Sequence, residues 1–245
     1  MAGVKYQGLS PRTRLLRWGL FSLAVGMVLY ATAPQATNLA VDWATAHQES
    51  LPWYATRILG FLAYGALAIS VVYGLLLSTG LLDAIAHRVV SFTLHQDLSA
   101  IAIGLTALHG AVLALDSFVP QTVRQLVIPF AGPYRPEWVG IGQLSLYLMV
   151  IVYASFYVRR RLGQRGWRLL HYTTLLAFAG ATAHGLMSGT DTPAAWAFWT
   201  YASASVAVVF LLGYRITLGL AHSVRPRTTA SAPVLRTSVI EEFSQ

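Results

Sequence analysis

The chain has 245 residues, of which 56% are hydrophobic and 11% are charged, and it contains no cysteine. A soluble domain carries about 25% charged residues, so this composition indicates an integral membrane protein. The lack of cysteine excludes disulfides, thiolate-bound iron–sulfur clusters and covalently attached c-type haem. The net charge of +8 does not indicate nucleic-acid binding, because the basic residues cluster in short connectors between apolar segments.

Six apolar segments follow one another along the chain, each near the length of about 20 residues that a transmembrane helix needs. They cover residues 15–33, 54–78, 92–115, 138–158, 167–187 and 194–220. The sequence therefore predicts an all-α integral membrane fold. Residues 1–14 form a cytoplasmic N-terminal segment, residues 15–221 a six-transmembrane-helix bundle, and residues 222–245 a disordered cytoplasmic tail rich in Ser, Thr and Pro.

The first apolar segment has two interpretations. Basic residues precede it and it ends in Ala31-Thr32-Ala33, a pattern that resembles a signal peptide with its cleavage site. The length of the apolar run, with Trp18 and Tyr30 at its two ends, favours a retained transmembrane helix.

The connector at residues 116–137 contains four prolines and a short apolar stretch at 123–130. It is either a helix lying on the outer membrane surface or a simple tether, and the sequence does not decide between them.

The distribution of basic residues predicts the orientation. Fourteen of the 17 Lys and Arg residues lie in the N-terminal part up to Arg17, between the second and third segments, in the connector of the fourth and fifth segments up to Arg168, or at the C-terminal end from Arg215 onward. Cytoplasmic loops carry an excess of Lys and Arg. Both termini are therefore expected in the cytoplasm.

Four histidines form two pairs on two apolar segments. His95 and His109 are 14 residues apart on the third segment, and His171 and His184 are 13 apart on the fifth. At a helical rise of about 1.5 Å per residue, each pair spans roughly 20 Å. Intramembrane histidines indicate function by default, and two facing pairs at two depths predict two stacked haems, each ligated by one histidine from each segment. His95 then pairs with His171, and His109 with His184.

The two spacings are not equivalent on a helix. Fourteen residues is close to a whole number of helical turns, whereas thirteen is not. We therefore expect a π-bulge, a tilt or a kink near Gly180, so that His171 and His184 both face the third segment.

Haem propionates need cationic or hydrogen-bonding partners near each membrane surface. The candidates are Arg88 and Arg168 on the inner side, and Arg57, Arg124 and Arg135 on the outer side, with Arg57 favoured because it opens the second segment. The alternative is that each is an arginine whose head group extends to the interface.

Several motifs give the chain a resemblance to the ferric-reductase-like transmembrane domain family, over roughly residues 53–220. They are His95-Gln96-Asp97-Leu98-Ser99, Leu108-His109-Gly110, Arg159-Arg160-Arg161-Leu162-Gly163 leading into Trp167-Arg168-Leu169-Leu170-His171, and Ala183-His184-Gly185. The outer stretches Val127-Ile128-Pro129-Phe130 and Tyr134-Arg135-Pro136 are similar to those of short bacterial members.

This resemblance implies two b-type haems, a bacterial inner membrane and electron flow from the cytoplasmic to the outer face. Many members continue into a flavin- and nicotinamide-binding domain, whereas this sequence has about 25 residues after its sixth segment. We therefore expect electrons from a separate reductase, from a flavin bound at a membrane face or from quinol, and an acceptor at the outer face.

Two other functions stay open on the sequence alone. One is a quinol-oxidising cytochrome b subunit, and the other is a non-redox membrane transporter or scaffold. Enzymatic activity of the chain itself is also left open, because the sequence contains no evident constellation of catalytic acid, base and nucleophile.

Overall fold

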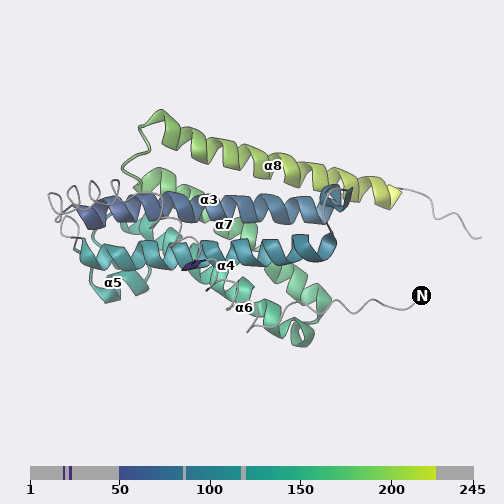
Figure 1. Ribbon diagram of the computed structural model, residues 1–245, viewed down its shortest axis with the longest axis horizontal. Helices are drawn as coiled ribbons and strands as arrows, with labels where there is room; N and C mark the ends of the chain where they lie inside the picture. The colour runs from purple at the N-terminus through teal and green to yellow at the C-terminus, as the bar shows by residue number, and fades with distance from the viewer. Residues whose placement is uncertain (1–18, 20–21, 24–49, 85–86, 117–119, 225–245) are drawn as a thin grey trace, which may run out of the picture.

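The computed structural model describes residues 19, 22–23, 50–84, 87–116 and 120–224. Over these residues the protein is all-helical (Figure 1). Of the first predicted segment, residues 15–33, only residues 19 and 22–23 are described, and the tail at 225–245 lies outside the described residues. The helices cover the other five predicted segments. Among the described residues, four helical stretches are long and apolar enough to cross a membrane. The predicted all-α fold is thus confirmed for these residues, with four candidate membrane-spanning helices.

Helix α3 (Leu51–Thr79) is the central element of the bundle. Pro52 lies in its first turn, where the missing N–H costs nothing, and Gly80 ends it in the left-handed conformation with φ 75°. The short 3-10 helix η1 (Leu81–Ala84) then leads into α4 (Arg88–Val112), which is extended by the 3-10 helix η2 (Leu113–Leu115). Helices α3 and α4 lie side by side and antiparallel (Figure 1).

Helix α5 (Val123–Val127) is a five-residue helix in the outer connector. The side chains of Thr122 and Gln125 cap its first turn reciprocally. The Gln143 side-chain amide donates to the carbonyl oxygens of Gln125 and Leu126, both at 2.8 Å. The connector is therefore a short helix held against α6 rather than a structureless tether.

Helix α6 (Pro136–Tyr172) contains one non-helical residue, Gly163, with φ 70° and ψ 160°. The chain reverses direction there, because Trp138 and Ser145 before Gly163 contact His184 and Gly180 after it. The predicted fourth and fifth spans thus form an antiparallel hairpin. The basic stretch between them, expected to be a loop, is helical on both sides of Gly163, since arginine is a good helix former.

Helices α7 (Thr174–Ser188) and α8 (Ala195–Val224) complete the described fold. Helix α8 lies against α3 on the side away from α4 (Figure 1). The buried core lies where α3, α7 and α8 meet, and it is formed mainly by Tyr64, Leu67, Ala68, Val71, Leu75, Ala177, Phe178, Tyr201, Val208 and Leu211.

Large apolar side chains also cover the outside of the bundle. On α8, Val206, Val209 and Phe210 are 68%, 69% and 70% exposed. A contiguous apolar surface is unfavourable in water but is the expected surface of a helix that faces lipid. Trp53 and Trp138 lie near the N-terminal ends of α3 and α6, and aromatic residues are enriched at such ends of membrane-spanning helices.

Candidate functional site

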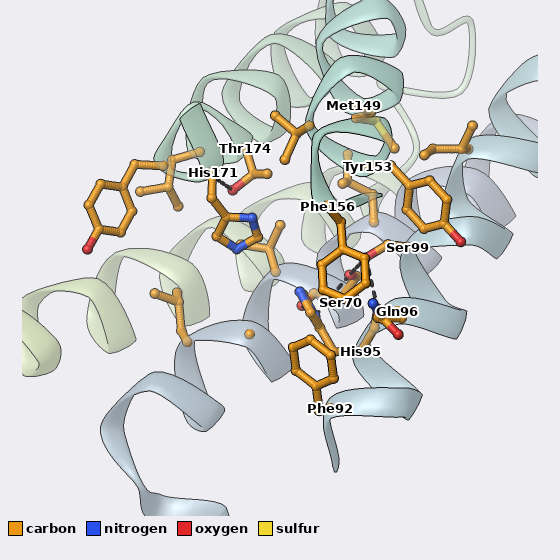
Figure 2. Close-up of a pocket in the computed structure, with 18 of the residues that line it drawn as sticks. Ser70, Phe92, His95, Gln96, Ser99, Met149, Tyr153, Phe156, His171 and Thr174 are labelled. Carbon is orange, nitrogen blue, oxygen red and sulfur yellow. Dashed lines mark hydrogen bonds between the residues drawn. The ribbon is translucent and has the colours of Figure 1, made fainter. Parts of the chain in front are cut away.

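The structure brings the four intramembrane histidines together in the two predicted pairs. The ring centres of His95 and His171 are 6.1 Å apart, with ring planes at 78°. Those of His109 and His184 are 6.3 Å apart, with planes at 75°. Figure 2 shows His95 and His171 reaching toward one another from different helices. Both pairs lie between α4 and the hairpin of α6 and α7.

These separations distinguish between two ways of joining imidazoles. Metal–imidazole bonds are about 2.0 Å long, so one ion held between two nitrogens places the ring centres roughly 6 Å apart. A direct hydrogen bond between two rings, with nitrogens about 2.9 Å apart, would bring the centres to roughly 5 Å. Both observed ring-centre separations match the distance expected when one metal ion lies between the two imidazoles.

Three of the four histidines donate their Nδ1–H to a backbone carbonyl oxygen. His95 donates to Ser70 at 3.1 Å, His109 to Thr56 at 2.8 Å, and His184 to Trp138 at 3.0 Å. A carbonyl oxygen only accepts, so the proton is on Nδ1 and the lone pair is on Nε2. Metal-ligating histidines are commonly oriented in this way. The three rings are therefore held in the tautomer that ligates a metal through Nε2.

A glycine accompanies each of these three carbonyls. In a helix, the carbonyl of residue i bonds the N–H of residue i+4, and a side chain at i+4 hinders approach from outside. Here residue i+4 is Gly74 for Ser70, Gly60 for Thr56 and Gly142 for Trp138. A Cβ atom added to these glycines would lie 2.9 Å from the His95 ring, 3.1 Å from the His109 ring and 2.7 Å from the His184 ring, respectively.

His171 is held differently. It stacks on Trp167, with ring centres 5.2 Å apart and planes at 22°. Among the hydrogen bonds of the described residues, none involves its ring. Both residues line a cavity of about 1080 Å³, counting its open mouth. This cavity, called the inner cavity below, lies at the pair formed by His95 and His171.

The residues present fit a haem better than a bare ion. Among the described residues, no three His, Asp or Glu side chains come together as a metal site. Two imidazoles alone leave an ion short of the three or four protein ligands that zinc requires, whereas a porphyrin supplies the missing nitrogens itself. The walls of the inner cavity are also mainly apolar and aromatic, as Phe92, Phe156 and Met149 illustrate (Figure 2).

The predicted irregularity between His171 and His184 is present, but the expected position near Gly180 was wrong. The helix is interrupted at Thr173, whose N–H bonds the carbonyl of Leu170 at 3.1 Å, three residues back instead of four. Gly180 has another role. A Cβ atom there would lie 3.2 Å from Ile141 and closer still to Ser145, so Gly180 allows α7 to pack tightly on α6.

Two of the three predicted outer arginines, Arg57 and Arg135, bind protein groups. The Arg57 Nε donates to Asp191 at 2.6 Å, and its guanidinium lies 4.0 Å above the Trp53 ring centre. Arg135 donates to the carbonyl of Met187. Arg57 thus ties the outer end of α3 to the turn between α7 and α8. Arg124, in α5, is exposed.

The predicted inner arginines lie away from the cavity. Arg88 is exposed and faces Asp83 at 4.0 Å, and Arg168 is exposed on the hairpin. Neither lines the inner cavity; Arg215 of α8 does. Sequence reasoning did not single out Arg215, because it resembled one more basic residue at the end of the sixth segment.

Comparison with protein-family models, with characterised proteins and with solved structures found no match to this chain.

Proposed function

We propose that this protein transfers electrons across a membrane through two b-type haems. His95 and His171 would ligate the inner haem, and His109 and His184 the outer one. The observation that carries the proposal is the pair of imidazole separations, 6.1 and 6.3 Å, repeated at two levels of the same bundle. Each haem would supply an iron that changes oxidation state, and the two histidines of its pair would be the protein ligands.

The protein's own contribution is ligation, orientation and exclusion of water. The carbonyls of Ser70, Thr56 and Trp138 fix three imidazoles by their Nδ1–H groups and leave each Nε2 lone pair available for a metal. The fourth, that of His171, is supported by the face of Trp167. Because two protein ligands leave no open coordination position, this arrangement suits outer-sphere electron transfer rather than oxygen or substrate binding.

Direction and partners follow from the same proposal. The six apolar segments favour a six-span fold, and the distribution of basic residues favours both termini in the cytoplasm. The resemblance to the ferric-reductase-like family favours a bacterial inner membrane. Electrons would then enter at the His95 level and leave at the His109 level. The donor is a separate flavin reductase, a flavin at the membrane face or quinol, and the acceptor lies at the outer face. This proposal also places the chain in the ferric-reductase-like transmembrane domain family.

Reconstituted vesicles test transfer directly. Purified protein is inserted into liposomes that contain ferricyanide, and dithionite, which does not cross the bilayer readily, is added outside. The trapped ferricyanide should lose its colour at a rate that scales with the protein content. Liposomes with the His109→Ala variant are the matched control and should be as slow as empty ones. A transporter or scaffold would give no bleaching in either case.

A further inference from the structure

Arg215 is the only Lys or Arg among the described residues that line the inner cavity. It projects from α8, a helix whose hydropathy and length suit a membrane span. An ionisable side chain within such a helix is costly without a partner of opposite charge, and for that reason it usually marks a functional site. Among the residues that the structure describes, no carboxylate lines this cavity, and the salt bridges join other pairs.

The neighbours of Arg215 are hydrogen-bonding aromatic residues. Its guanidinium donates to the Tyr172 hydroxyl at 3.1 Å and lies 5.2 Å from the centre of that ring. Trp167, also in the cavity wall, has a buried indole N–H with no hydrogen-bond partner. A buried donor without an acceptor is unfavourable. The cavity wall therefore contains one cation with no carboxylate partner among the described residues and one unused hydrogen-bond donor.

We propose that Arg215, with Tyr172 and Trp167, forms an anion-binding corner that holds a carboxylate of the cofactor in the inner cavity. The assignment rests on the proposed function, because the carboxylate is a propionate of the inner haem. It replaces Arg88 and Arg168, which are exposed and do not line the cavity. A guanidinium suits a carboxylate because its N–H groups can make two parallel bonds to the two oxygens.

The test compares haem with its dimethyl ester, in which both carboxylates are blocked. Full-length protein carrying His109→Ala, which leaves only the inner site, is purified without haem and titrated with each porphyrin by absorbance. Arg215→Gln should weaken haem binding about tenfold or more, since bonds to charged groups contribute about 1.5–3 kcal/mol. Binding of the dimethyl ester should be the same with and without Arg215→Gln. Arg168→Gln is the matched control and should bind both porphyrins as the parent does.

A second variant distinguishes a lost contact with the carboxylate from misfolding of the Arg215→Gln protein. Trp167→Phe keeps the ring that supports His171 but removes the N–H, and it should also weaken haem more than the dimethyl ester. Equal losses for both porphyrins, or no loss for haem in Arg215→Gln, would overturn the assignment. So would an Arg215→Gln protein that loses affinity for flavin mononucleotide but keeps its affinity for haem, because the anion would then be a phosphate. A parent protein that binds neither porphyrin would overturn the proposed function as well.

Discussion

The Nδ1–H of His184 bonds the carbonyl oxygen of Trp138 at 3.0 Å, and Gly142, one turn after Trp138, leaves the space that the ring fills. The same relationship joins His95 to Ser70 beside Gly74, and it recurs for His109. Three glycines thus let three imidazoles reach helical carbonyls that already have a partner within their own helix. This arrangement makes the backbone, rather than other side chains, the main support of the proposed ligands.

The glycines can be tested without touching a histidine. Gly142→Ala should reduce the haem content from two per chain to about one, because the new Cβ would lie 2.7 Å from the His184 ring. Such overpacking typically costs about 1–3 kcal/mol. The measurement is haem per chain by the pyridine haemochrome method. Gly65→Ala is the control, since a Cβ there meets nothing within 4 Å; if both variants behave alike, the glycine has no special role.

Double substitutions test the pairing of the histidines. His109→Ala and His184→Ala should each remove one haem, and combining them should remove no more, because both ligate the same group. Combining His109→Ala with His95→Ala should remove both haems. Reduced-minus-oxidised spectra of these four variants and of the wild type give the haem content. Equal haem content in the two double variants would contradict the pairing.

The hydroxyl of Ser70 should matter less than its carbonyl. Its Oγ is 3.4 Å from His95 Nδ1 and 2.8 Å from the Ser99 hydroxyl, whereas the carbonyl is 3.1 Å from the same Nδ1. Ser70→Ala keeps the carbonyl, so the variant should retain two haems with an unchanged spectrum. Gly74→Ala should displace the His95 ring and lose the inner haem. The reverse order of effects would show that the hydroxyl holds the ring.

The ion pair between Arg57 and Asp191 should stabilise the fold rather than bind cofactor. The side chains are only 29% and 12% exposed, so removing one partner leaves the other partly buried and unpaired. Asp191→Asn and Arg57→Gln should each lower the thermal midpoint in detergent, and the double variant should lose less than the sum of the two. All three should keep two haems. Loss of the outer haem in Arg57→Gln, but not in Asp191→Asn, would show that Arg57 contacts the cofactor.

Much of this arrangement could be predicted because hydropathy and spacing report it directly. The spacing of His95 and His109 predicts two histidines at different depths on one helix. The nearly equal spacing of His171 and His184 predicts that a second helix places one histidine at each of the same depths. The position of the helix interruption could not be predicted in this way. The turn at Thr173 is tightened by a local backbone hydrogen bond, and a threonine in an apolar segment does not indicate a helix interruption. Glycine is a common cause of helix kinks, so the sequence pointed to Gly180 instead.

The glycine positions were accessible in principle. Gly60 and Gly74 are 14 residues apart, the same spacing as His95 and His109 on the neighbouring antiparallel helix. Because glycine is common in apolar helices, that match is informative only once the two helices are known to pack together. Arg215 was harder to find. Its place in the inner cavity depends on how α8 crosses α3, a tertiary relationship that no local pattern encodes.

The central claim is most directly tested by the haem content and spectrum of the purified wild-type protein. The account predicts about two non-covalently bound b-type haems per chain, with sharp bands on reduction by dithionite that are typical of two histidine ligands. A well-folded, colourless protein that takes up no haem when it is supplied would contradict the account.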